Sequence, residues 1–136
     1  MEKENQYDIE VLQAGLEVEN TLDLFLGREF DERQISVVDE MKKMVKRITN
    51  PNIGQGRRIY VNRLARLSRV LSSGENLLLL QTKQTLDETK NIFKRGNLKA
   101  MVESRKQAVE IIGIMQEQIA DLEIKFPLEN NSDKEK

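Results

Sequence analysis

The amino-acid sequence predicts an all-α protein, a bundle of four to five helices that ends in a long antiparallel αα-hairpin with coiled-coil-like packing. Two observations predict this fold class. Along the C-terminal third of the chain, apolar residues recur in alternating steps of three and four, as on a helix that buries one narrow seam. The composition agrees, because the 136 residues include only two Pro, two Tyr, four Phe and no Trp, which favours helices over β-structure.

The seam lies on a predicted final helix at about 98–126. Arg105 is its only charged position, and two interpretations of it stay open. Its long stem can carry the charge past the seam or to a nearby acid, or a polar seam position can fix the register of the helices. The seam positions are Leu98, Met101, Arg105, Ala108, Ile112, Met115, Ile119, Leu122 and Phe126.

The other helices follow from apolar periodicity and from start and stop signals. The first helix is apolar on two sides, with Ile9, Leu12 and Leu16 forming a smaller second strip. Asp31 and Gln34 form a capping-box-like pattern at the start of the second. We expect one domain over 1–126, followed by a disordered tail at 127–136. The predicted helices span about 7–26, 31–48, 58–72, 76–95 and 98–126.

Two further breaks are predicted, one at Ser72–Glu75 and one at Gly96–Asn97 as the hairpin turn. Four consecutive leucines between these breaks surround the whole circumference of a helix, so this turn lies deep in the bundle or in an oligomer interface. Together with the two apolar sides of the first helix, they form more apolar surface than one chain can cover. The sequence therefore predicts a homo-oligomer. The residues predicted for its interface are Leu77, Leu78, Leu79, Leu80, Ile112, Met115, Ile119 and Leu122.

Charge is distributed unevenly although the net charge is −1. The first forty residues hold twelve Asp and Glu against Lys3, Arg28 and Arg33, whereas 41–74 contain no acidic residue. The basic segment can bind nucleic-acid phosphates, or it can lie beside the acidic first helix. Its glycine loop lacks the spacing of a phosphate-binding P-loop. The candidate nucleic-acid-binding residues are Lys42, Lys43, Lys46, Arg57, Arg58, Arg63, Arg66 and Arg69.

Several chemistries are disfavoured by residue types that the sequence lacks. Without Cys there is no thiol nucleophile, disulfide or thiolate metal site, and without His the commonest general base and metal ligand are missing. Neighbouring carboxylates on a helix point about 100° apart, which is poor geometry for sharing an ion. We therefore predict no catalytic residue, no metal and no cofactor. No apolar run is long enough to span a membrane, and we expect a cytoplasmic protein.

These observations predict a non-enzymatic helical interaction protein, an adaptor, assembly or regulatory factor that self-associates. The prediction follows from helix seams with no attached chemistry. The alternative is a protein that binds the nucleic-acid backbone through the basic segment at 42–69. The sequence does not identify the protein partner.

Overall fold

The protein is all-helical in the computed structural model, which describes residues 2–26, 32–50 and 56–125. The described residues form four α-helices and no strand. The prediction of an all-α bundle is confirmed at this level, with four helices rather than five. They are α1 (Glu2–Leu26), α2 (Glu32–Ile48), α3 (Arg57–Glu88) and α4 (Ile92–Lys125). None of these helices is long and apolar enough to cross a membrane.

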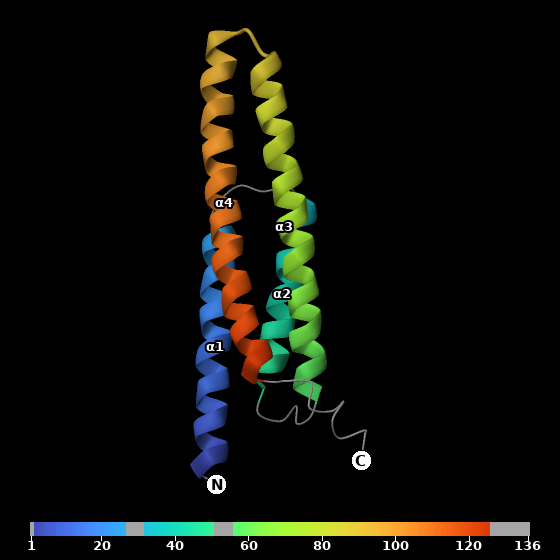
Figure 1. The fold of residues 1–136 in the computed structure, drawn as a ribbon, viewed down its shortest axis with the longest axis vertical. Helices are drawn as coiled ribbons and strands as arrows, with labels where there is room; N and C mark the ends of the chain where they lie inside the picture. The colour runs from blue at the N-terminus through green and yellow to red at the C-terminus, as the bar shows by residue number, and fades with distance from the viewer. Residues whose placement is uncertain (1, 27–31, 51–55, 126–136) are drawn as a thin grey trace.

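The four helices form a ring in which each packs against two others. α1 contacts α2 and α4, and α3 also contacts α2 and α4, whereas α1 and α3 make no contact within the described part of the chain. α1 and α2 lie beside only one half of the α3–α4 pair, and the other half projects beyond them (Figure 1). We call the four-helix part the base and the projecting part, residues 76–104, the arm.

The base contains a continuous apolar core to which all four helices contribute. On α4 the predicted seam is confirmed there, since Ala108, Ile112, Met115, Ile119 and Leu122 are all buried. The other helices supply side chains of the same kind, which removes large apolar areas from water. The largest are Leu22 of α1, Met41 and Ile48 of α2, and Leu64 and Leu71 of α3.

The seam changes position in the arm. Met101, a predicted seam residue, is exposed, while its neighbour Val102 is buried. In the arm α4 has only α3 to pack against, so the buried side of the helix rotates towards that one neighbour. The coiled-coil geometry predicted for this pair stays a prediction, and Phe126 lies outside the described residues.

The predicted break at Ser72–Glu75 is wrong, because α3 continues through it. Glu75 is fully buried in the middle of the helix and does not cap a new one. Gly74 has a packing role: a Cβ atom added there would lie 2.5 Å from Oε1 of Gln34 on α2. The glycine thus allows the close approach of a neighbouring side chain.

The predicted turn at Gly96–Asn97 is also wrong, since both residues lie within α4. The chain turns instead at Thr89–Asn91, where Thr89 is extended with φ −92° and ψ 128°. Apart from its chain neighbours and the backbone of its own helix, no atom of the described residues lies within 4 Å of a Cβ built at Gly96. The sequence pattern therefore signalled a break where a helix tolerates the glycine.

The predicted capping box at the start of α2 stays a prediction. The side-chain amide of Gln34 donates a hydrogen bond of 3.1 Å to the carbonyl oxygen of Leu71 on α3. Asp31, the predicted cap, lies outside the described residues. On α1, the predicted second strip of Ile9, Leu12 and Leu16 is exposed, as its position opposite the core requires.

Candidate interaction sites

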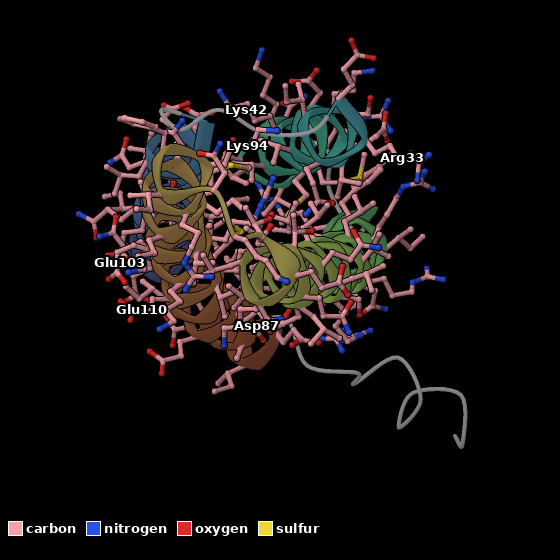
Figure 2. The ribbon with its side chains drawn as sticks, turned by 90° about the horizontal axis from the view of Figure 1, so that it is seen from above. Arg33, Lys42, Asp87, Lys94, Glu103 and Glu110 are labelled. Atoms are coloured by element: carbon pink, nitrogen blue, oxygen red, sulfur yellow. The ribbon has the colours of Figure 1, made fainter. Side chains whose placement is uncertain are left out.

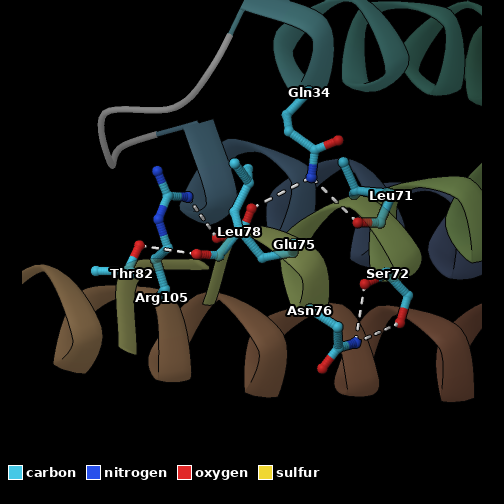
Figure 3. Close-up of polar contacts among 8 residues, drawn as sticks. All are labelled: Gln34, Leu71, Ser72, Glu75, Asn76, Leu78, Thr82 and Arg105. Carbon is cyan, nitrogen blue, oxygen red and sulfur yellow. Dashed lines mark hydrogen bonds and ion pairs between the residues drawn. The ribbon is translucent and has the colours of Figure 1, made fainter. Parts of the chain in front are cut away.

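A polar network marks the level at which the base ends and the arm begins. The carboxylate of Glu75, which has no exposed surface, accepts hydrogen bonds from Nη1 of Arg105 at 3.0 Å and from Nε2 of Gln34 at 3.2 Å (Figure 3). Residues from α2, α3 and α4 meet here. The interpretation of Arg105 as the partner of a nearby acid is confirmed, and its role in fixing helix register stays a prediction.

Beyond this network the arm exposes apolar side chains. Leu77 and Leu80 are exposed, and Leu78 and Leu79 are half-buried, because only α4 covers α3 there. These four leucines stay candidates for an interface. The remaining four predicted interface residues are buried in the chain's own core, so the fold leaves no surface of theirs for a second chain: Ile112, Met115, Ile119 and Leu122.

The end of the arm is a turn held by hydrogen bonds from both helices. Oδ1 of Asn91 accepts the backbone N–H groups of Phe93 at 2.9 Å and Lys94 at 3.1 Å, which satisfies donors at the start of α4. Nη1 of Arg95 donates to the carbonyl oxygens of Leu86 and Thr89, satisfying acceptors at the end of α3. We call residues 86–95 the tip. Side chains of the chain itself thus hold the backbone of the tip in place.

The tip presents the two most exposed large apolar side chains of the described residues. Ile92 is 82% exposed and Phe93 is 86% exposed. Sequence reasoning missed both residues because it placed the turn after them. The available signal was Asn91, a favoured N-cap residue, directly before the apolar pair.

Arg57 and Arg58 of the predicted nucleic-acid site are engaged in contacts within the chain. Nε of Arg57 donates to the carbonyl oxygen of Ile48 at 2.9 Å, at the end of α2. Nη1 of Arg58 donates to the carbonyl oxygen of Glu123 at 3.0 Å, near the end of α4. Cations at helix C-termini stabilise unpaired carbonyls and the helix dipole.

Three more of the predicted cations form ion pairs. Lys42 pairs with Asp23 of α1, and Glu40 pairs with Lys43 at 3.4 Å and with Arg63 at 3.7 Å. The proposed contact with the acidic first helix is thus made by Lys42. Phosphate binding by the basic segment stays a prediction. The three candidates that are exposed and have no ion pair among the described residues are Lys46, Arg66 and Arg69.

The part of the chain that the structure describes contains no group of three or more acidic, His or Cys side chains placed to hold a metal ion. Comparison with protein-family models, with curated proteins and with solved structures returned no significant match.

Proposed function

We propose that this chain is a non-enzymatic helical interaction protein, an adaptor, assembly or regulatory factor, whose tip binds a protein partner. One observation carries the proposal. Ile92 and Phe93 stand almost fully exposed on a turn that is already ordered by Asn91 and Arg95. Large apolar side chains that a fold leaves in water mark interaction sites when they lie together.

The physical gain from covering these side chains is substantial. Removing a Phe or Ile side chain from water is worth about 1.5–3 kcal/mol each. An ordered turn loses little further conformational entropy on binding, so more of that gain becomes affinity. Exposed Lys90 and Lys94 flank the apolar pair. The partner that fits this tip has an apolar pocket with a polar rim, because aromatic anchors in such pockets dominate interface energies.

Affinity capture from the native cell extract tests the proposal, with proteins quantified by mass spectrometry. Phe93→Ser removes the aromatic anchor and should abolish capture of the specific partner. Ile124→Ser is the matched control, because Ile124 is also largely exposed but lies at the opposite end of α4. We expect the control to capture the same proteins as the unmodified chain. Equal capture by Phe93→Ser and Ile124→Ser would contradict a tip-dependent function.

The nucleic-acid alternative is tested by the same samples treated with nuclease. If the basic segment binds a nucleic-acid backbone, the captured proteins should disappear after nuclease treatment whichever variant is used. Survival of capture under nuclease favours the tip. The contacts within the chain support this outcome, because Arg57, Arg58 and three other candidate cations already have protein partners.

A further inference from the structure

The outer face of α1 combines exposed apolar residues with acidic charge. Ile9, Leu12 and Leu16 are each about half exposed and follow one another in steps of three and four along the helix. Such a strip is suited to pack against another helix. Residues 4–27 include no Lys or Arg, and their acidic residues are Glu4, Asp8, Glu10, Glu17, Glu19 and Asp23.

The outer face of α3 also carries exposed apolar residues, and its charge is the opposite one. Ile59, Val70, Leu77 and Leu80 are exposed, and they belong to one stripe with steps of three and four when Arg63, Arg66 and Ser73 are included. From Arg57 to Gly74 the helix contains no acidic residue. Arg66 and Arg69 are exposed on this side and form no ion pair among the described residues.

These two faces cannot meet within one chain. Among the described residues α1 and α3 make no contact with each other, because each packs against α2 and α4. Seen along the bundle, they occupy opposite corners (Figure 2). Lys42 of α2 pairs with Asp23, so α1 receives one basic partner from its own neighbour, while the arginines on α3 stay far from the acids of α1.

We infer that a second copy of this chain covers both faces, with the outer face of α1 in one copy packed on the outer face of α3 in the next. Charge selects this pairing. Contact between two α1 faces would set acid against acid, and contact between two α3 faces would set arginine against arginine, and both juxtapositions are repulsive. This assembly goes beyond the proposed function, because it uses helix faces outside the tip.

An antiparallel arrangement satisfies both the apolar and the charged positions. The spacing of seven between Ile9 and Leu16 equals that between Val70 and Leu77. When Ile9 lies opposite Leu77, Leu16 lies opposite Val70. Glu19 then comes within one residue of the level of Arg66, which places opposite charges beside the apolar contact.

The positions of the two faces determine the type of assembly. Because they lie at opposite corners, one copy meets one neighbour through α1 and a different neighbour through α3. This is a heterologous contact, which builds head-to-tail chains, or rings where the rotation closes. Each face offers only three or four apolar side chains, less than a stable dimer interface normally buries. Association is therefore concentration-dependent, and salt weakens it by screening the charges.

Two variants that each disable one face test this assembly by sedimentation velocity. Leu12→Glu with Leu16→Glu disables α1, and Val70→Lys with Leu77→Lys disables α3; all four positions are exposed. At roughly 50 mM salt, where screening is weak, the unmodified chain should form species larger than a dimer as its concentration rises. Each variant alone should be monomeric. An equimolar mixture should give a dimer and nothing larger, because one intact face of each kind remains.

A monomeric unmodified chain, a closed dimer, or a mixture that stays monomeric would overturn the inference. Circular dichroism reports whether each variant keeps its helices. If either one unfolds, single charge exchanges take its place: Glu19→Lys and Arg66→Glu should each weaken association severalfold, and mixing them should restore it. No restoration overturns the pairing. Phe93→Ser separates this inference from the tip, because it should abolish partner capture and leave self-association unchanged.

Discussion

α3 and α4 pass through two environments along their length, and comparing the base with the arm shows what each environment does. Leu71 in the base has no exposed surface, whereas Leu78, two turns further along on the same side of α3, is half-buried. Both leucines therefore have the same helical backbone and face the same direction. What differs is that α2 packs beside Leu71, where Gln34 reaches its carbonyl oxygen, and does not extend along the arm (Figure 1). Whether a leucine of α3 is buried therefore depends on which helices cover it, and not on the local sequence.

The largest expected effect contrasts Leu71 with Leu77, an exposed leucine on the outer face of the arm. Leu71→Ala leaves a cavity in a packed core and should lower the free energy of unfolding by about 4 kcal/mol. Leu77→Ala removes a side chain that is half in water, and should cost less than about 1 kcal/mol. Urea denaturation at low protein concentration, where self-association is absent, measures both. Similar losses from the two substitutions would mean that the arm is covered in solution.

The next effect concerns the network between base and arm. Arg105→Leu leaves the buried carboxylate of Glu75 with Gln34 as its one remaining hydrogen-bond partner among the described residues, which should cost about 3 kcal/mol. Replacing both Glu75 and Arg105 by Leu removes the buried charge as well as its partner. The double variant should therefore be more stable than Arg105→Leu, since apolar pairs often replace buried ion pairs at little cost.

Urea denaturation of Glu75→Leu, Arg105→Leu, the double variant and the unmodified chain completes this comparison as a double-mutant cycle. The coupling free energy between Glu75 and Arg105 is the change in unfolding free energy of the double variant minus the sum of the changes in the two single variants. A double variant that is less stable than Arg105→Leu would show that the ion pair stabilises the junction by more than the cost of burying its two charges.

The sequence predicted the base better than the arm, and the reason is physical. Seam positions such as Ile112 and Met115 are buried by several helices at once, so their periodicity alone identifies them. At Met101 the same periodicity fails, because the arm lacks α1, the second helix against which α4 packs in the base. Which part of a long helix is covered depends on the lengths of α1 and α2 and on their alignment with it.

The candidate site could be predicted only in part. The four leucines of the arm were identified because a fully apolar turn needs a partner on every side. The tip was missed, since Gly96 was taken as the turn while Asn91 forms the cap. The buried ion pair was half predicted: Arg105 was recognised as exceptional, but its partner Glu75 falls in the stretch Ser72–Glu75, which was predicted to break the helix. From the sequence alone, a glycine that permits a turn cannot be told from one that makes room for a neighbouring side chain.

The smallest expected effect concerns Gly74 and Gly96, the two glycines at which the sequence wrongly predicts breaks between helices. Gly96 lies inside α4 with no other atom within 4 Å of an added Cβ. Gly96→Ala should therefore raise the free energy of unfolding by up to about 1 kcal/mol, the difference in helix propensity between the two residues. At Gly74 the same gain is opposed, because the added methyl group would lie 2.5 Å from Oε1 of Gln34.

Gly74→Ala must displace a buried amide that donates to Glu75 and to the carbonyl oxygen of Leu71. Leaving such buried polar groups without partners costs about 1–3 kcal/mol, which exceeds the gain in propensity. The substitution should therefore destabilise the protein, although it is chemically identical to the stabilising one at Gly96. Urea denaturation of both variants gives the sign of each change. Stabilisation by both would mean that Gln34 moves aside freely, and that the junction between base and arm tolerates the loss of its contact with α2.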